Sequence, residues 1–223
     1  MTTYQTVIDK AELLLQDEET DQNLRRWTET ELMTWAKDGE KEIVKIKPDA
    51  NAVIESVQLG SGSAQTLPSR AIQLLDVLSN MGTNGSTRGN IISVVERSLM
   101  DAIQPDWMIT TAADVVTHVI YDPKRVPKIY WVYPQSTGNN YIEIITGKLP
   151  DNGSNLISDD LEVGEEYENA LLHYILAMAF AKDSDIPQSG ERMVGHMTTF
   201  LNMLGRMDLV EQLINPHKVG GQE

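Results

Sequence analysis

Hydrophobic residues recur with a helical period near both ends of the chain and with a period of two in its middle. Near the amino terminus, one predicted helix covers residues 6–17, and its apolar face consists of Val7, Ile8, Ala11, Leu14 and Leu15. A second helix is predicted from residue 29, because Thr28 and Glu31 have the spacing of a capping box. It ends before Pro48, since proline cannot continue a helix.

From residue 52 onward, apolar and polar side chains alternate, which is the pattern of half-buried strands. Strands are predicted at residues 52–58, 64–67, 72–78, 91–95, 115–121, 128–133 and 141–146, with a short helix or turn at 96–103. Gly-, Asn- and Pro-containing turns separate them. A strand spacing of roughly 8–12 residues favours a small antiparallel sandwich or barrel over alternating βαβ units.

The last third of the chain returns to the helical period. Asp159 is placed to cap a helix over residues 161–182, and Pro187-Gln188-Ser189 starts a further helix. Gly205 caps or kinks that helix, and residues 207–214 add a few turns before Pro216 ends them. We therefore predict an α+β fold, with a helical bundle from residues 1–48 and 158–215 and a central antiparallel β sandwich or barrel over 49–157. Residues 216–223 form a tail that we expect to be flexible in the isolated chain.

The chain is acidic, with 33 Asp and Glu against 18 Lys and Arg and a net charge of −15. This charge argues against wrapping nucleic acid, because phosphate contacts need clustered basic residues. Solubility is the simplest explanation of the charge. The more specific alternative is a channel wall that repels DNA, so that the duplex slides past without binding. The absence of cysteine excludes disulfides and Cys-based metal sites. The sequence has no signal-peptide pattern and no apolar run near the roughly 20 residues of a membrane span, so we expect no membrane association.

Catalytic motifs are missing from the sequence, so we predict no enzyme, no cofactor and no metal site. No phosphate-binding loop is present, and none of the four histidines has a partner at i+4. His173 and His196 meet if their helices pack antiparallel, but a pair without a third ligand is typical of a polar contact. Turn capping explains the carboxylates of the β region, namely Asp101, Asp106, Asp114 and Asp122.

Large side chains offer candidate interface positions. Aromatic residues concentrate in the β region, and Trp107, Tyr130 and Trp131 are our candidate subunit contacts there. Lys124, Arg125 and Lys128 form a small basic patch. A strand edge that carries charge against aggregation explains this patch better than DNA binding does. Met193 and Met197 belong to the last predicted helices. Two interpretations remain open for them, namely core filling and an adaptable docking face.

Several diffuse motifs resemble the head-to-tail adaptor proteins of short-tailed bacteriophages, which are similar in role to the tail tubular protein A group. They are the turn prolines of Lys47-Pro48-Asp49-Ala50 and Gln104-Pro105-Asp106-Trp107, the strands Leu74-Leu75-Asp76-Val77 and Tyr130-Trp131-Val132-Tyr133-Pro134, and the Ala-rich run from Tyr167 to Asp183.

This resemblance implies a structural virion protein at the head–tail junction, assembled in the host cytoplasm. It implies a homo-dodecamer, a ring that forms on the portal protein, with the helical part toward the portal and the β part toward a tail tube or nozzle protein. DNA would pass through the lumen without specific binding. The implied contacts include the tail residues Pro216, His217 and Lys218, and the lumen candidates are Asp151, Asp159 and Asp160.

Two other hypotheses remain at this point. The first is an acidic, non-enzymatic partner-binding module of the phage tail that acts as a monomer or dimer. The second is a carboxylate-based hydrolase, for which the sequence carries no motif.

Overall fold

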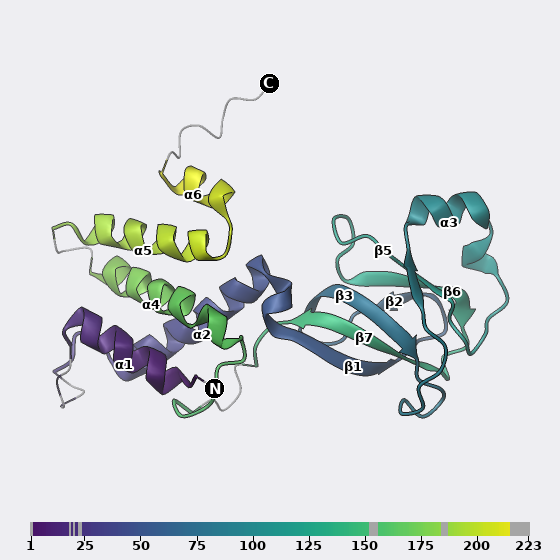
Figure 1. Ribbon diagram of the computed structural model, residues 1–223, viewed down its shortest axis with the longest axis horizontal. Helices are drawn as coiled ribbons and strands as arrows, with labels where there is room; N and C mark the ends of the chain where they lie inside the picture. The colour runs from purple at the N-terminus through teal and green to yellow at the C-terminus, as the bar shows by residue number, and fades with distance from the viewer. Residues whose placement is uncertain are drawn as a thin grey trace, which may run out of the picture. The chain divides into compact units, whose positions relative to one another are not determined.

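The computed structural model describes residues 2–17, 19, 21, 24–151, 156–183 and 187–214. The chain forms two compact units, one made of residues 1–50 with 150–223 and the other of residues 51–149. The first unit is helical and the second carries the strands, which confirms the predicted α+β class (Figure 1). The second boundary falls at residue 150, earlier in the chain than the sequence-based expectation of 157. No helix of the described residues is long and apolar enough to cross a membrane.

Among the residues that the structure describes, five α-helices and two short 3-10 turns belong mainly to the helical unit. Their bounds are α1 Tyr4–Leu15, α2 Glu29–Ile46, η1 Pro48–Asn51, η3 Glu165–Tyr167, α4 Glu168–Lys182, α5 Ser189–Met203 and α6 Met207–Ile214.

The first two helices begin where side chains cap them. Thr3 caps α1 by accepting from the N–H of Thr6 at 3.3 Å, so this helix starts two residues earlier than predicted. It ends at Gln16, whose φ of 56° lies in the left-handed region. The predicted capping box of α2 is confirmed, because Thr28 and Glu31 exchange both of its hydrogen bonds.

Helix α4 lies at the centre of the helical unit, where it contacts α1, α2 and α5 (Figure 1). Its buried residues surround the helix axis instead of forming one stripe: Ala170, Leu171, Ile175, Leu176, Ala177 and Ala179. A helix that is apolar all round is typical of such a central position. Helix α6 packs on α5.

For helix α4, the predicted start at residue 161, capped by Asp159, is wrong. Residues 161–164 are not helical, because tertiary hydrogen bonds hold their backbone. The N–H of Leu161 donates to the carbonyl of Thr2 at 3.0 Å, and the N–H of Glu162 donates to the Glu40 carboxylate at 2.9 Å. These backbone donors are therefore committed to α2 and to the amino terminus before the helix begins.

Seven strands and two short helical turns make up the β unit. Their bounds are β1 Ala52–Gln58, β2 Gly62–Thr66, β3 Ala71–Asn80, β4 Ser93–Val95, α3 Arg97–Ile103, η2 Trp107–Ile109, β5 His118–Tyr121, β6 Ile129–Ser136 and β7 Tyr141–Lys148.

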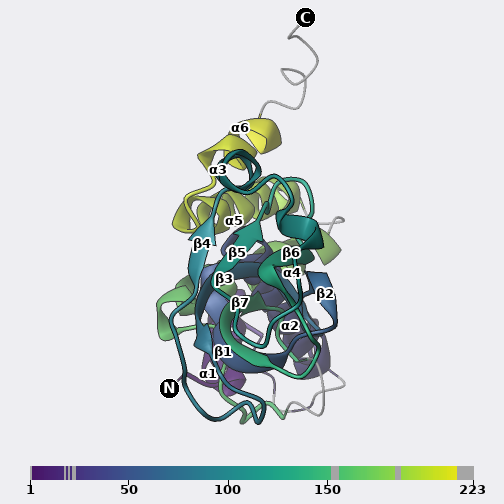
Figure 2. The same cartoon turned by 90° about the vertical axis from the view of Figure 1, so that its right-hand side faces the viewer.

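The strands form two sheets. In the first, β7 lies between β1 and β3 and is antiparallel to both. The second has the order β2-β6-β5-β4, with β2 and β4 at opposite edges (Figure 2). The sequence analysis expected antiparallel strands throughout, but β4 pairs with β5 in parallel. This orientation requires the long connection between them, which contains α3 and η2.

The two sheets enclose one apolar core, as expected for a sandwich. Its members come from both sheets and include Leu74 and Val77 of β3, Val119 of β5, Val132 of β6 and Ile144 of β7. Side chains at alternate positions of β5 and β6 point away from this core. There, residues of α3 and η2 cover them and form a second apolar cluster.

Candidate interface surfaces

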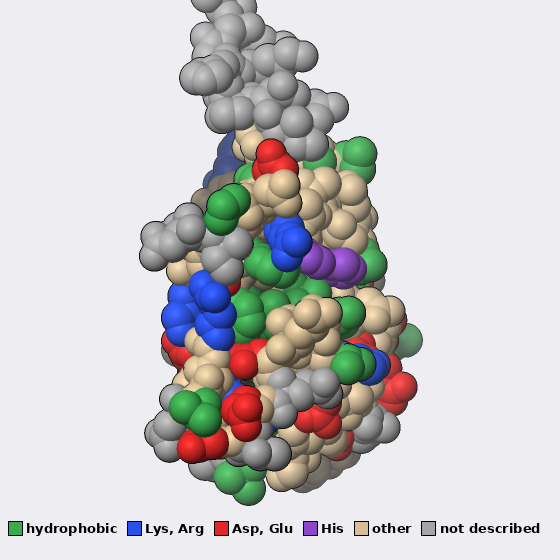
Figure 3. All heavy atoms as spheres, turned by 90° about the vertical axis from the view of Figure 1, so that its left-hand side faces the viewer, with side chains coloured by type: hydrophobic (Ala, Val, Ile, Leu, Met, Phe, Trp, Pro, Cys, Tyr) green, Lys and Arg blue, Asp and Glu red, His purple; other side chains and the backbone are tan. Residues whose placement is uncertain are grey.

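A cleft with apolar and charged walls opens at one end of the helical unit. It has a volume of about 490 Å³ and lies between the last turn of α1, the segment before α2, the end of α4 and the start of α5. Its apolar walls are Leu14, Leu15, Trp27 and Phe180. Figure 3 looks onto this end of the unit, where hydrophobic side chains gather in a hollow between basic side chains.

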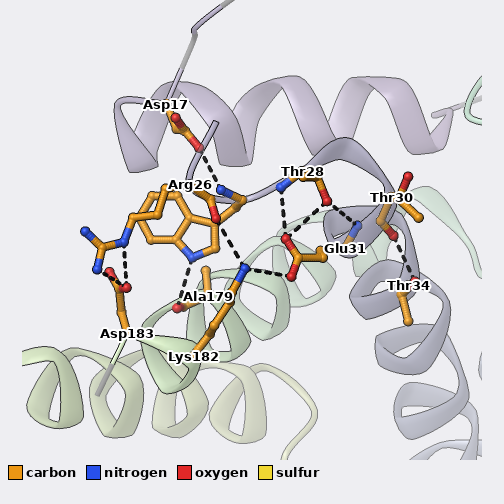
Figure 4. A network of polar contacts seen from close by, with 10 residues as sticks. Asp17, Arg26, Thr28, Thr30, Glu31, Thr34, Ala179, Lys182 and Asp183 are labelled. Atoms are coloured by element: carbon orange, nitrogen blue, oxygen red, sulfur yellow. Dashed lines mark hydrogen bonds and ion pairs between the residues drawn. The ribbon is translucent and has the colours of Figure 1, made fainter. Parts of the chain in front are cut away.

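Trp27 lines this cleft and is held in place by hydrogen bonds at two positions. Its backbone N–H donates to Oδ2 of Asp17 at 2.9 Å, and its indole Nε1–H donates to the carbonyl of Ala179 at 3.2 Å. Lys182 joins the same segment to α2, since its Nζ donates to the carbonyl of Arg26 at 3.2 Å and to Oε1 of Glu31 at 2.6 Å (Figure 4). The segment before α2 is thus tied to the end of α4.

The hydrogen bond from Lys182, followed by the bond from the Thr28 backbone, holds the pKa of the Glu31 carboxyl below its usual value. Glu31 is therefore charged at neutral pH and serves both the capping box and the Lys182 bridge.

The charged residues of the cleft are arranged so that positive groups face solvent. The guanidinium of Arg26 binds the Asp183 carboxylate, with Nε donating to Oδ1 at 2.6 Å. In this pair the Arg26 side chain is 48% exposed and the Asp183 side chain is 8% exposed. Arg192 lies over the Phe180 ring, 5.5 Å from its centroid, and makes no ion pair with any residue that the structure describes. The cleft therefore presents the Arg192 guanidinium and the exposed side of Arg26, while Asp183 binds Arg26 and Asp17 binds the Trp27 backbone.

The predicted meeting of His173 and His196 is confirmed. Their Nδ1 atoms lie 2.9 Å apart, so one Nδ1–H donates to the other nitrogen across the α4–α5 contact. His196 also stacks on Phe180, with ring centroids 5.6 Å apart. Burial lowers the pKa of both imidazoles, and the positive charge of Arg192 adds to the effect at His196. Within the described ranges, no group of three or more His, Cys, Asp or Glu residues is placed to hold a metal ion.

Glu40 of α2 is a fully buried carboxylate that joins three parts of the helical unit. Tyr4 of α1 donates its hydroxyl to Oε2, and the backbone N–H groups of Glu162 and Val163 donate to Oε1 at 2.9 and 3.3 Å. Burial is the largest influence on this carboxyl and raises its pKa, despite the donated hydrogen bonds. Because its oxygens accept bonds from the protein itself, Glu40 acts as a structural link.

The predicted basic patch of the β unit is neutralised by nearby carboxylates. Lys124 and Arg125 line a hollow of about 690 Å³ together with acidic residues, among them Asp101 and Asp122. Arg125 lies 3.6 Å from Asp122, whose Oδ1 also accepts from the backbone N–H groups of the turn. Lys128 donates to the carbonyl of Ala71. This surface lacks the uncompensated charge that phosphate binding needs.

Comparison with known families assigns the chain. The family model described as SU10 adaptor protein matches residues 2–220. The chain belongs to this family. Membership confirms the resemblance to phage head-to-tail adaptors and the assignment as a structural protein of a bacteriophage. A search of curated proteins found no match.

In this adaptor, the structure places the predicted interface residues in different environments. Trp107 and Tyr130 are each 1% exposed and belong to the cores of the β unit, so their rings pack within their own subunit. Trp131 is partly exposed, with the Arg97 guanidinium 5.9 Å from its ring centroid. Met193 and Met197 are half-buried on α5. Pro216, His217 and Lys218 lie outside the described residues.

The lumen candidates of the adaptor are exposed residues of the helical unit. Asp151, Asp159 and Asp160 all face solvent. The Asp159 carboxylate accepts from the N–H of Leu156 at 2.7 Å, so it stabilises a turn.

The sequence analysis missed the apolar surfaces of the adaptor. Leu14, which it assigned to the apolar face of the first helix, is 58% exposed at the rim of the cleft. In the β unit, Leu99, Ile103 and Ile109 are exposed around α3 and η2, and the sequence analysis did not single them out. The available signal was their place beside chain turns, where fewer neighbouring residues cover an apolar side chain.

Proposed function

We propose that this protein is a head-to-tail adaptor that forms a ring beneath the portal, extends the DNA channel and provides the docking platform for the tail. The observation that carries the proposal is the family match over residues 2–220. The role is structural: the protein binds its neighbours and performs no chemical reaction. Its place is the virion, after assembly in the host cytoplasm.

The division into two units supports a protein with two different partners. The helical unit carries the apolar cleft with its two guanidinium groups, and it is assigned to the portal. The β unit exposes Ile103 at 69% and Ile109 at 80%, and this surface is assigned to the tail tube or nozzle protein. Large exposed apolar side chains are typical of protein contact sites.

Acidic charge suits the passage of DNA. A ring of about twelve copies, each with a net charge of −15, surrounds the duplex with a negative potential that disfavours binding. The exposed carboxylates Asp151, Asp159 and Asp160 are the candidates for the lumen wall. Neighbour contacts within the ring are assigned to Trp131, Met193, Met197 and the tail residues 216–218.

Native mass spectrometry of the chain alone and with its cognate portal tests this proposal. We expect a largely monomeric free chain that becomes a ring of about twelve copies on the portal. A chain that stays a monomer or dimer in the presence of the portal would support the acidic partner-binding module instead.

A pair of variants tests the assignment of the two units. Ile109→Asp is expected to form the ring on the portal and to lose attachment of the nozzle protein, because a charge at an interface centre is costly to bury. Ile54→Asp, which changes a 60% exposed isoleucine of β1 outside this surface, is the matched control for the β unit. Nozzle attachment equal to that of the unchanged chain would contradict the assignment of Ile109.

A further inference from the structure

The cleft of the helical unit has features of a binding site for a short segment of another protein. Its volume of about 490 Å³ lies within the range of pockets that take small ligands, and here it fits a few side chains. Leu14, Trp27 and Phe180 supply an apolar wall. The wall is preorganised, because hydrogen bonds from both the backbone and the indole of Trp27 fix its position.

One charged group of the cleft, the guanidinium of Arg192, is left to attract a negative occupant. Asp183 is nearly buried under Arg26, and Asp17 accepts from the Trp27 backbone, so neither carboxylate is available to a ligand's cation. Arg192 stands over Phe180 and has no carboxylate partner in the described part of the chain. The first turn of α5, which adds the positive end of its helix dipole, also lines the cleft through Ser189.

We propose that this cleft binds a segment of the portal protein in which one large apolar side chain stands between carboxylates. The apolar side chain would lie against Phe180 and Leu14, one carboxylate would bind Arg192, and a second would share the half-exposed Arg26 guanidinium with Asp183. Guanidinium groups suit this role, because they form two hydrogen bonds with one carboxylate. The identity of the partner rests on the proposed adaptor function, whereas the chemistry of the segment rests on the cleft.

Nucleic acid is the less suitable occupant. The chain is strongly negative overall, and the cleft walls offer apolar surface where a nucleic acid would need several basic contacts.

Synthetic peptides test the chemistry of the cleft directly. The probes are fluorescein-labelled hexapeptides with one Leu, Met, Phe or Trp between acidic residues, and their binding to the full chain is followed by fluorescence anisotropy. We expect binding of at least one acidic peptide. We expect no binding of peptides in which lysine replaces the acids or serine replaces the apolar residue. Failure of all acidic peptides, or equal binding of the lysine peptides, would overturn the proposal.

Two variants locate the binding. Arg192→Glu is expected to weaken the acidic peptide about tenfold and to admit the lysine peptide, which a merely structural role of Arg192 would not produce. Leu14→Ser is expected to weaken the peptide to a similar degree. Their matched controls lie on the β unit: Arg125→Glu and Leu99→Ser each change an exposed residue of the same type and should leave binding unchanged. Equal effects of variants and controls would place the site elsewhere and overturn the proposal.

The portal itself then tests the partner. If the unchanged chain binds the portal and Arg192→Glu binds at least tenfold more weakly, the proposal holds. If both bind equally, the cleft proposal fails while the adaptor function stands. If the unchanged chain does not bind the portal, the adaptor function fails. Self-association of the chain that Arg192→Glu abolishes would identify a second copy as the occupant and also overturn the proposal.

Discussion

The substitution Gly39→Ala tests the closest helix contact in the helical unit. Gly39 lies in the interior of α2, where it faces α4. A methyl group at this position would stand 2.6 Å from Cδ1 of Leu171 and 2.8 Å from Cδ1 of Tyr174. Leu171 is fully buried, so it has no free space into which it can turn.

Two effects of opposite sign decide the outcome. Alanine is favoured over glycine inside a helix by about 0.8–1 kcal/mol. Overpacking of a filled core costs about 1–3 kcal/mol, and the upper part of that range applies here because two side chains must move. The expected net change is therefore a loss of about 1–2 kcal/mol in the free energy of unfolding.

Chemical denaturation, followed by the circular dichroism signal of the helices, measures this change, because five of the six α-helices in the described part of the chain belong to the helical unit. Gly195→Ala is the matched control. Gly195 is exposed within α5, and a methyl group there meets nothing within 4 Å. This control is expected to gain about 0.8–1 kcal/mol from helix propensity alone. If Gly39→Ala were as stable as the unchanged chain, or gained as much as the control, the argument from close packing would be refuted.

Two further predictions concern polar groups of the helical unit. Thr28→Ala removes the capping box of α2 and is expected to cost about 1 kcal/mol in the same denaturation assay, whereas Thr28→Ser keeps the capping hydroxyl and most of the stability. Glu40→Gln removes a buried charge whose pKa is raised by burial. The folded state therefore binds more protons than the unfolded state between the ordinary and the raised pKa, so the stability that Glu40 contributes is complete at low pH and is lost as pH rises. The free energy of unfolding of the glutamine variant should therefore rise relative to that of the unchanged chain as the pH increases from acidic to neutral. Denaturation curves recorded at several pH values measure this difference.

Other outcomes would contradict these two arguments. Equal losses for the alanine and serine variants of Thr28 would show that the hydroxyl has no capping role. If the Glu40→Gln variant instead gained stability relative to the unchanged chain as the pH falls, the hydrogen bonds to the carboxylate would outweigh the cost of its burial.

Local signals in the sequence predicted the fold class and most elements. The capping box at Thr28 and Glu31 marks the start of α2 because both partners lie within one helical turn. Strand periodicity and turn residues located the strands of the β unit in the same local way. Helix periodicity also placed His173 and His196 on adjacent helices, where they do meet.

Long-range contacts decided what these patterns left open. The backbone of Glu162 and Val163 is not helical, because its N–H groups donate to Glu40, more than a hundred residues away in the chain. The parallel pairing of β4 with β5 depends on the connection around α3.

For the candidate surfaces, too, the sequence determined some properties and the tertiary structure decided the others. Composition by itself determined that the chain is acidic, free of cysteine and without a catalytic motif. Tertiary structure decided that Trp107 and Tyr130 fill cores while Leu14 is exposed. The physical reason is that burial depends on which segments arrive from elsewhere in the chain, whereas period and capping depend on neighbours within a few residues. The cleft itself exists only because four separate segments meet around Trp27.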